Sequence, residues 1–580
     1  MPAEYEPGSA RPRRRGFENL DLLVATLLGL GLAICLWGQG GQDDKYITYW
    51  PARTLAEHAE IVNYNGIRLE QSSSLSLVLL LAAAYKATPF SMPMVGYLVS
   101  LTGAALTGLV AIRLARRMGL GARGGVAAAV LTAPSFGYWA TSGMETPWLP
   151  LAALWFIDGL TAPETPRGRA QGFRLGLAAL LFAAMRPEAP LLLGGLCLVF
   201  VALAALAGRP LFVAARRAGV GLAAIAAVFA FRKLYFDAWW PHPAVVKTGG
   251  FDPLEGAGYL WDSTLNAGAF PVLLFLAGAG LVAARPARRQ GDGVAALVTA
   301  LGIGQLAFIV VSGGDWMSGG RFFAPAVPAL VLVGFVALEA LASAARTRTL
   351  LVAAYCVSNL LFGIQLLHRG ITDGQPLWSL HGAIERVEAR IGPSPIASVE
   401  LMNRIHRRDA VVIDELLEIA DAIVARVPAR RIHALTGQAG MLAYHLVAKH
   451  PDRFNVLDLW SLTDRQLMDC FPPGSIETSR WGTLIGTWRP FAEHAEITAR
   501  CGLPLPDLFF NADVESHLPK QFAELGYEIL YHQVGHLGSE ASGFFPSWYP
   551  ADGFIAVKRD LAQAAGLRKQ PTWRWNLDPP

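Results

Sequence analysis

Two adjacent carboxylates, Asp43 and Asp44, open the stretch GQDDKYITYWPAR, which follows the uncharged run Leu22–Gln42. An ionisable pair at the mouth of a membrane helix is costly unless it is solvated, paired or functional. Two close carboxylates raise one another's pKa, so that one can accept a proton while the other stays charged. Taking a proton from an attacking hydroxyl is the role of a general base. We therefore interpret Asp43 and Asp44 as candidate catalytic residues; the alternative is a solvated helix end.

Further charged residues recur in the other loops that we expect on the same side of the membrane. An arginine at membrane level can bind a phosphate through its planar fork, and a lysine can do so as a point charge. The alternative is internal ion pairing, of Arg186 with Glu188 and of Asp315 with Arg321. The candidate substrate-binding residues are Glu70, Glu145, Arg186, Glu188, His242, Lys247, Asp315, Trp316 and Arg321.

The composition indicates a membrane protein. Of the 580 residues, 53% are hydrophobic and only 16% are charged, whereas about a quarter of the residues in a soluble protein are charged. The net charge is +4, but the arginines are scattered between apolar runs and form no basic stripe, so we expect no nucleic-acid partner. The sequence contains no glycine-rich phosphate loop with its lysine, which argues against ATP-driven transport. A divalent cation stays open as a cofactor: a carboxylate pair could bind one, but two adjacent residues alone are weak evidence for it, so no metal ligands are assigned.

Eleven apolar runs are candidates for membrane crossings, which need about 20 predominantly apolar residues. The long uncharged runs are Leu22–Gln42, Pro93–Ile112, Gly124–Met144, Ala189–Gly208, Ser263–Ala284, Gly293–Gly314 and Leu350–Leu367. The shorter or interrupted runs are Thr146–Gly159, Leu175–Met185, Ala218–Phe231 and Phe322–Leu338.

The arginines predict the direction of these crossings, because cytoplasmic loops carry an excess of Lys and Arg. Four arginines before the first run predict a cytoplasmic N-terminus: Arg11, Arg13, Arg14 and Arg15. Eleven crossings would then place five arginine-rich loops inside, at residues 113–123, 167–174, 209–217, 285–289 and 346–348. The Asp43–Asp44 pair and the C-terminal segment would both lie outside.

The more polar C-terminal segment, residues 368–580, is predicted to be a separate α/β domain. Its short apolar stretches RIHALTG and YEILYHQV indicate strands, and HGAIERVEARI and DELLEIADAIVARV indicate amphipathic helices. Cys470 and Cys501 lie in this domain and form a disulfide in one interpretation and free thiols in the other. We expect residues 1–16 to be disordered and residues 17–367 to form the transmembrane catalytic module. The predicted fold is thus a polytopic α-helical membrane protein with a soluble C-terminal domain.

The sequence resembles the GT-C type glycosyltransferases, polytopic enzymes that use lipid-phosphate sugars outside the cytoplasmic membrane. Within this class it is most similar to the terminal arabinofuranosyltransferases of mycobacterial cell-wall synthesis. The resemblance rests on short motifs in a common order: QDDKYITYWPARTLAEH, VNYNGIRLEQSSS, SGMETP, MRPE, WWPHPAVVKTG, GGDWMSGGRFFAP and TGQAGMLAYH. One departure is SSSLSLVLL after Glu70, where relatives often carry an aromatic residue, and it concerns the donor-sugar pocket.

The resemblance implies a pentosyltransferase of the bacterial cytoplasmic (inner) membrane, with its active site and C-terminal domain facing the periplasm. The implied donor is a polyprenyl-phosphate sugar, decaprenyl-phosphoryl-arabinofuranose, whose lipid chain would lie between the helices beside the membrane lipids. The acceptor would be a glycan, a lipid-linked molecule or a protein. Asp43 is implied as the leading catalytic carboxylate and Asp44 as its partner. The candidate contacts of the donor phosphate, chosen by charge, are Arg186, His242, Lys247 and Arg321.

Other functions are consistent with parts of the sequence. A transporter or flippase of lipid-linked sugars would share the many spans, but it should place ionisable residues near the bilayer midplane, in paired halves. No internal repeat is visible in this sequence, and its charges gather at one expected face. A non-enzymatic envelope scaffold would leave the aspartate pair without a role. A GT-C transferase with a different sugar or a protein acceptor stays open.

Overall fold

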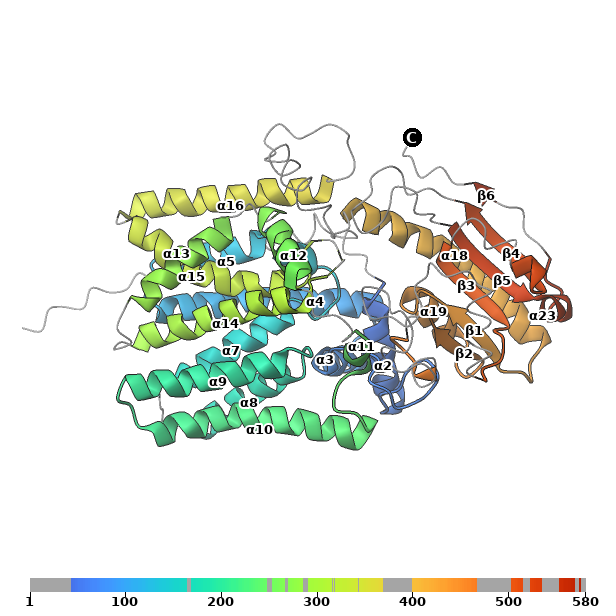
Figure 1. Ribbon diagram of the computed structural model, residues 1–580, viewed down its shortest axis with the longest axis horizontal. Coiled ribbons are helices and arrows are strands. Elements are labelled where there is room, and N and C mark those ends of the chain that lie inside the picture. Colours follow the sequence, from blue (N-terminus) through green and yellow to red (C-terminus); the bar gives the residue numbers. More distant parts are fainter. Residues whose placement is uncertain are drawn as a thin grey trace, which may run out of the picture.

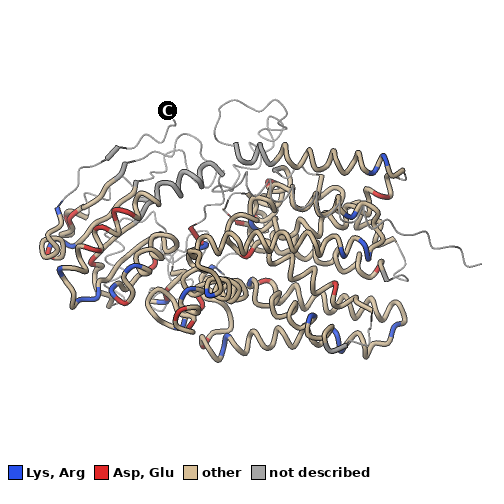
Figure 2. The backbone as a smooth tube through the Cα atoms, turned by 180° about the vertical axis from the view of Figure 1, so that it is seen from behind, with Lys and Arg blue, Asp and Glu red and all other residues tan. Residues whose placement is uncertain are grey.

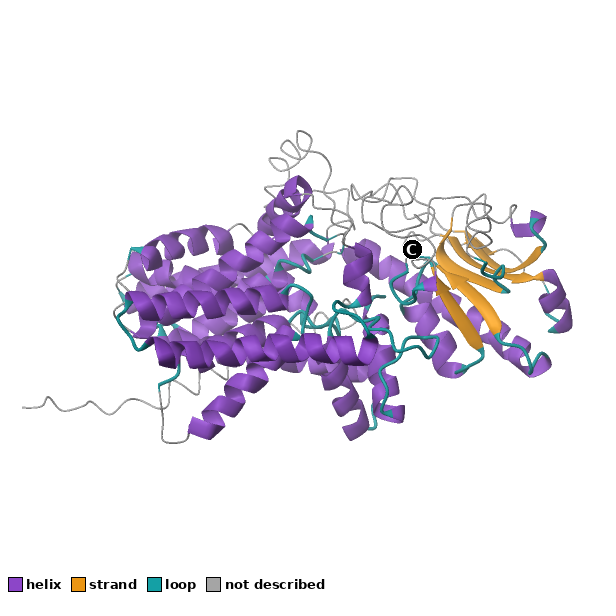
Figure 3. Ribbon diagram, turned by 60° about the horizontal axis from the view of Figure 1, so that its bottom comes forward, coloured by secondary structure: helices purple, strands orange, loops and turns teal. Residues whose placement is uncertain are grey.

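A bundle of helices and a smaller domain built on a β-sheet make up the protein (Figure 1). The structure is a computed structural model of the chain. It describes residues 43–163, 168–247, 253–266, 270–284, 290–315, 317, 319–342, 344–368, 399–459, 461–466, 502–514, 522–534, 552–568 and 573–574. The sheet is confined to one end of the molecule, and helices form the rest (Figure 3).

Five helices of the described chain are long and apolar enough to cross a membrane, or six if one bent pair counts as a single span. The five are α4 (Met92–Arg117), α9 (Ala189–Leu206), α10 (Leu211–Phe236), α14 (Gln290–Ser312) and α15 (Val327–Leu341), the last extended by the 3-10 turn η1 (Ala324–Ala326). The bent pair is α12 (Pro253–Asn266) with α13 (Phe270–Ala283). Shorter apolar helices are α3 (Leu75–Ala87), α7 (Trp148–Thr161) and α8 (Gly168–Ala183).

These helices fall on most of the predicted crossings, and α16 (Ala345–His368) covers the last of them. Helix α15 is almost completely enclosed, with Val327–Leu338 buried, so it lies in the core of the bundle. Lys, Arg, Asp and Glu are sparse along the helices and gather toward the helix ends and in the sheet domain (Figure 2). Because the first predicted run, Leu22–Gln42, lies outside the described residues, the count of eleven stays a prediction.

The prediction of one continuous span over Gly124–Met144 is wrong. Helix α5 (Arg123–Thr132) ends before Ala133, whose backbone is extended with φ −61° and ψ 127°, and α6 (Pro134–Trp139) begins at the next residue. A proline restricts the residue before it to extended conformations, so Pro134 breaks the helix even though the run is apolar throughout.

Among the described helices that precede the C-terminal domain, three fall on none of the predicted spans: Lys45–His58, Leu75–Ala87 and His242–Lys247. The stretch from Lys45 to His58, expected as a loop, forms α2 (Lys45–His58). Helix α3 begins after Ser74, whose hydroxyl accepts a hydrogen bond from the Leu77 N–H and so caps it. Together with the short helix α11 (His242–Lys247), these elements lie between the bundle and the sheet domain (Figure 1).

The segment that joins α2 to α3 is fixed to the bundle by a buried ion pair. Glu70 binds Arg232 of α10 through two contacts, Nε–Oε2 at 2.8 Å and Nη2–Oε1 at 3.0 Å. Both side chains are buried, and Arg232 has no exposed surface. The Glu70 carbonyl also accepts a hydrogen bond from the backbone N–H of His242, at 3.0 Å. One glutamate therefore places both this segment and the start of α11.

The C-terminal domain contains a six-stranded mixed sheet in the order β2-β1-β3-β5-β4-β6. The strands are β1 (Ile432–Thr436), β2 (Phe454–Asp458), β3 (Leu508–Val514), β4 (Tyr527–Val534), β5 (Asp552–Lys558) and β6 (Trp573–Arg574). β1 pairs in parallel with both β2 and β3, whereas β5 is antiparallel to β3 and β4. The helices of the domain are α18 (Val399–Arg426), α19 (Met441–Lys449) and α23 (Arg559–Ala564).

The sequence predictions for this domain are confirmed where the structure describes it. RIHALTG contains β1, and YEILYHQV coincides with β4. DELLEIADAIVARV forms the second half of α18, apart from its last residue. The predicted helix HGAIERVEARI lies outside the described residues, as do Cys470 and Cys501.

The buried Glu70–Arg232 pair predicts a stability pattern. Replacing Arg232 by Met should lower the free energy of unfolding by about 3–5 kcal/mol, because Glu70 is left buried without a counter-charge. The double variant Glu70→Leu/Arg232→Met should recover much of this loss, since no buried charge remains. Denaturant unfolding of the purified protein in detergent measures both. A double variant as unstable as the single one would contradict the interpretation.

Candidate functional site

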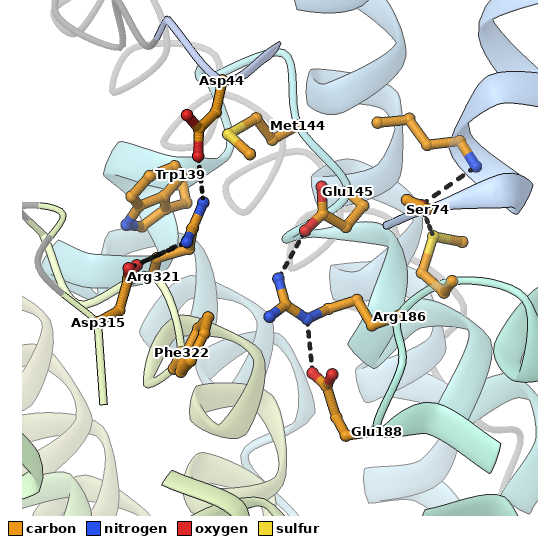
Figure 4. A network of polar contacts seen from close by, with 12 residues as sticks. Asp44, Ser74, Trp139, Met144, Glu145, Arg186, Glu188, Asp315, Arg321 and Phe322 are labelled. Atoms are coloured by element: carbon orange, nitrogen blue, oxygen red, sulfur yellow. Dashed lines mark hydrogen bonds and ion pairs between the residues drawn. The ribbon is translucent and has the colours of Figure 1, made fainter. Parts of the chain in front are cut away.

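Charged side chains from four connections meet at one end of the bundle (Figure 4). Asp44 immediately precedes α2, and Glu145 lies just before α7. Arg186 and Glu188 lie between α8 and α9. The last group, Asp315, Arg321 and Phe322, lies between α14 and η1. These residues come from four of the predicted loop motifs. Glu70 is not among them, because the structure pairs it with Arg232.

Arg321 is held between two carboxylates, which lie on different sides of it in Figure 4. Its Nη1 donates to Asp44 Oδ2 at 3.1 Å, and its Nη2 donates to Asp315 Oδ1 at 3.0 Å. Burial opposes the charge of this guanidinium, but Asp315 and Asp44 together raise the pKa of Arg321 above its usual value. The Arg321–Asp315 pair was one alternative of the sequence analysis and is confirmed. The Asp44 contact was not predicted.

Arg186 forms the second centre of the site. Its Nη1 lies 2.6 Å from Glu145 Oε1, and its Nε lies 2.5 Å from Glu188 Oε1. All three side chains are buried. The predicted pairing of Arg186 with Glu188 is confirmed, and Glu145 is a second partner from a distant loop. Because two carboxylates bind it, this guanidinium is fixed in orientation.

The two arginine centres meet at Phe322. The Arg186 guanidinium carbon lies 4.7 Å from the centre of its ring, and that of Arg321 lies 5.4 Å from it. An aromatic ring attracts cations through its face, so Phe322 holds both arginines side by side despite their like charge. The sequence analysis missed this residue. The signal was its place directly after Arg321 in the motif GGRFF.

Lys247 is a third cation of the site, at the end of α11. Burial lowers the pKa of Lys247, and Asp44 acts in the opposite direction; Arg321, Asp315 and Arg186 also contribute. Its side chain is nevertheless accessible to solvent. Among the described residues, the Lys247 ammonium makes no hydrogen bond or ion pair, in contrast to Arg186 and Arg321.

Close packing of α2 against its neighbours places the Glu145 loop. The Tyr49 hydroxyl approaches Gly143, which has φ +80°, and Gly96 of α4. A Cβ atom would lie 2.2 Å from this hydroxyl at Gly143 and 2.0 Å from it at Gly96. Only glycine fits both places, and at Gly143 the left-handed backbone requires it as well. The loop SGMETP is therefore fixed against the helix that Asp44 precedes.

Asp43 points away from this group and toward the sheet domain. Its Oδ1 accepts a hydrogen bond from the backbone N–H of Met441, at 2.5 Å. The two adjacent carboxylates thus have different partners: Asp44 binds an arginine of the bundle, and Asp43 binds the first residue of α19.

Three further predicted residues remain: two have partners near the site, and one lies outside the described residues. His242 is buried, and its Nε2 lies 2.9 Å from the Asp464 carbonyl oxygen, which can only accept, so Nε2 carries a proton. Glu70 is bound to Arg232, and this partner was missed although an arginine inside the apolar run VFAFRKLYF was a signal for it. Trp316 lies outside the described residues. A role of these three residues in binding substrate stays a prediction.

The described residues contain no group of three or more His, Cys, Asp and Glu side chains that could hold a metal ion. Whether a divalent cation takes part is not tested by this observation, because a substrate phosphate can complete such a site.

The Arg186 centre predicts a specific loss of stability. Arg186→Lys should lower the free energy of unfolding by about 1–3 kcal/mol, because one ammonium cannot reproduce both fixed contacts and leaves a buried carboxylate poorly paired. The matched control is Arg113→Lys, in a pair with Asp158 where the arginine side chain is 61% exposed. A change within about 0.5 kcal/mol is expected there. Equal losses in the two variants, measured by denaturant unfolding in detergent, would argue against the fixed network.

Comparison with known proteins agrees with this architecture. No protein-family model and no curated protein matches the chain. Among solved structures, the crystal structure of ArnT from Cupriavidus metallidurans in the apo state matches with a TM-score of 0.52 and 14% sequence identity, over 94% of this chain and 99% of that one. The Archaeoglobus fulgidus oligosaccharyltransferase in the apo form matches with a TM-score of 0.47 and 12% identity, over 90% of this chain and 74% of that one. The protein has the fold of the GT-C membrane transferases, with a small sheet in its C-terminal region.

Proposed function

We propose that the protein is a membrane glycosyltransferase that moves a pentose, D-arabinofuranose, from a polyprenyl-phosphate donor to a glycan or another acceptor of the cell envelope. The observation that carries this proposal is the position of Asp44. Its carboxylate is 23% exposed and lies beside a buried arginine network at the helix ends. A carboxylate, fixed cations and an accessible lysine at membrane level are the groups that transfer from a lipid phosphate requires.

Asp44 is the general base of the proposed reaction. Arg321 holds its Oδ2, and among the described residues its Oδ1 makes no hydrogen bond, which leaves that oxygen for the acceptor hydroxyl. The hydroxyl oxygen forms a bond to the anomeric carbon while the bond from this carbon to the phosphate oxygen breaks. The phosphate takes the bonding electrons, and Asp44 takes the hydroxyl proton. The Arg321 contact keeps this carboxylate in place while its second oxygen faces the hydroxyl.

The basic residues stabilise the leaving phosphate in this proposal. Arg186 and Arg321 are each bound to two carboxylates, so their charge is largely compensated before substrate enters. Lys247 has no such partner among the described residues and is the principal phosphate contact. The fixed arginines keep the geometry of the site, so that only the Lys247 side chain has to adjust when negative charge develops on the phosphate.

The donor sugar and the orientation rest on the sequence. The ordered loop motifs resemble those of terminal arabinofuranosyltransferases, which supports arabinofuranose as the sugar. The arginine-rich loops support a cytoplasmic N-terminus, and with it a bacterial inner-membrane protein whose site and C-terminal domain face the periplasm. The fold supports a lipid-linked donor and a sugar, peptide or lipid acceptor without selecting one.

Asp44→Asn should reduce the rate of arabinofuranose transfer at least about 100-fold, because an amide cannot accept the proton. The assay uses purified protein in detergent, synthetic decaprenyl-phosphoryl-arabinofuranose and a short arabinoside. Asp237→Asn is the matched control, since Asp237 also pairs with a cation but its side chain is 86% exposed and lies outside the site. A folded Asp44→Asn variant with the wild-type rate would exclude Asp44 as the base.

The same assay separates the alternatives. Transfer from a different polyprenyl-phosphate sugar, and not from the arabinofuranose donor, would correct the sugar and keep the reaction. Donor binding without transfer to a glycan, lipid or peptide acceptor would favour a transporter of lipid-linked sugars.

The lowered pKa of Lys247 predicts a pH dependence of phosphate binding. Only the protonated amine attracts the phosphate, so affinity should fall as pH rises through the lowered pKa, below the ordinary lysine value of about 10.4. Lys247→Arg stays charged over this range and should keep its affinity. The dissociation constant of decaprenyl phosphate, measured from neutral pH upward in both proteins, tests this expectation. Parallel pH curves would show that Lys247 does not bind the phosphate.

A further inference from the structure

The contact between Asp43 and the sheet domain joins residues 398 positions apart in the chain. Met441 is the first residue of α19, and the first N–H groups of a helix have no partner within the helix. The Asp43 carboxylate accepts this N–H at 2.5 Å. A negative charge at the N-terminus of a helix is also favoured by the helix dipole. Asp43 therefore caps a helix that belongs to the other domain.

The sheet domain is shaped to receive this carboxylate. A Cβ atom at Gly440 would lie 2.2 Å from Asp43 Oδ2 and 2.3 Å from the Asp43 carbonyl oxygen, so any side chain there would push the aspartate away. The Tyr64 hydroxyl lies 3.3 Å from the Gly440 carbonyl and 3.3 Å from the Tyr46 carbonyl, and it joins the same two segments.

The place of the contact in the sheet is also distinctive. β1 ends at Thr436, and α19 begins at Met441, so only a short loop separates them. In the sheet, β1 lies between β2 and β3 and is parallel to both. From β1 the chain continues to β2 on one side and later to β3 on the other, so the direction in which strands are added reverses beside β1. In open α/β sheets such a reversal, at the carboxyl ends of the strands, is where ligands bind. Asp43 of the membrane module lies against the helix that starts at this end of β1.

Asp43 and Asp44 are consecutive residues, so fixing one constrains the other. The carbonyls of both accept hydrogen bonds in the first turn of α2, from Tyr46 and Ile47, each at 3.1 Å. The sheet domain holds the Asp43 side chain, while the Asp44 side chain reaches Arg321 of the bundle. A shift of the Asp43 contact would move the peptide that carries Asp44.

We propose that Asp43 is a positioning residue, through which the C-terminal domain orients Asp44 toward Arg321. The domain thereby acts on the catalytic step through a contact at the switch point of its sheet. The part of this inference that concerns catalysis rests on the proposed function, in which Asp44 is the base. It differs from the expectation in the sequence analysis, in which Asp43 is the leading catalytic carboxylate and Asp44 its partner.

Hydrogen exchange tests the contact without any activity. In the full-length protein in detergent, Asp43→Ala and Gly440→Ala should each speed amide exchange in the first turn of α19. Asp43→Asn should change it less, because the side-chain amide oxygen still accepts the Met441 N–H. Asp43→Ala changes the acceptor in the membrane module, whereas Gly440→Ala changes the sheet domain. If one of these variants fails to fold, the other still tests the contact. Unchanged exchange in Asp43→Ala would overturn the proposal.

Thermal unfolding tests the coupling to Asp44, also without activity. Asp43→Ala and Asp44→Asn, alone and combined, form a double-mutant cycle. If Asp43 orients Asp44, the combined loss of melting temperature should be smaller than the sum of the single losses, because the Asp44–Arg321 contact is already weakened. Strictly additive losses would overturn the positioning role even if the chain transfers no sugar.

Kinetics distinguish positioning from proton transfer. Asp43→Asn should lower kcat less than Asp43→Ala does and keep the acid limb of the wild-type pH–rate profile, whereas Asp44→Asn loses that limb. Gly440→Ala should lower kcat with the donor KM nearly unchanged. Loss of transfer in Asp43→Asn as complete as in Asp44→Asn, with normal exchange in α19, would identify Asp43 as a proton acceptor and overturn the proposal. No transfer by the wild type would refute the proposed function alone, since exchange and unfolding still decide the contact.

Discussion

The need to compensate buried charge governs the structure around Arg321. Leaving one member of a buried ion pair without its partner costs several kcal/mol, more than a single interaction usually contributes to folding. Arg321 therefore requires both Asp315 and Asp44, and Arg186 requires both Glu145 and Glu188. These partners come from four separate segments, each at the end of a described helix or between two of them. Their mutual compensation brings the segments together at one end of the bundle, where Phe322 joins the two centres.

The same network leaves Lys247 as an accessible cation. The arginines fix the geometry of the site because their charges are already balanced by protein carboxylates. A lysine that has no carboxylate bound to it among the described residues can respond to an incoming phosphate. Structure and reactivity are thus divided between different cations: the planar guanidinium groups hold the loops, and the flexible ammonium group is available to substrate.

The adjacent aspartates also have different roles in the structure. A single turn before α2 sends the Asp44 side chain to the bundle and the Asp43 side chain to the sheet domain. Neighbouring contacts strengthen this connection between domains. Asn65 pairs with both the backbone N–H and the carbonyl of Val456 on the edge strand β2, at 2.7 and 2.8 Å. His242 binds the Asp464 carbonyl, so the helix that ends in Lys247 also contacts the sheet domain. The sheet domain therefore contacts both the segment that carries Asp44 and the helix that carries Lys247.

The sequence by itself determined the features that depend on local pattern. Apolar runs identified most of the membrane helices, because crossing a bilayer imposes length and hydropathy on each helix separately. Neighbouring charges identified the Arg186–Glu188 and Asp315–Arg321 pairs, which lie two and six positions apart. Only the tertiary structure decided the partners of Asp43, Asp44 and Glu70, which lie between 162 and 398 positions away. Such partners depend on how helices pack, and neither composition nor spacing carries that information.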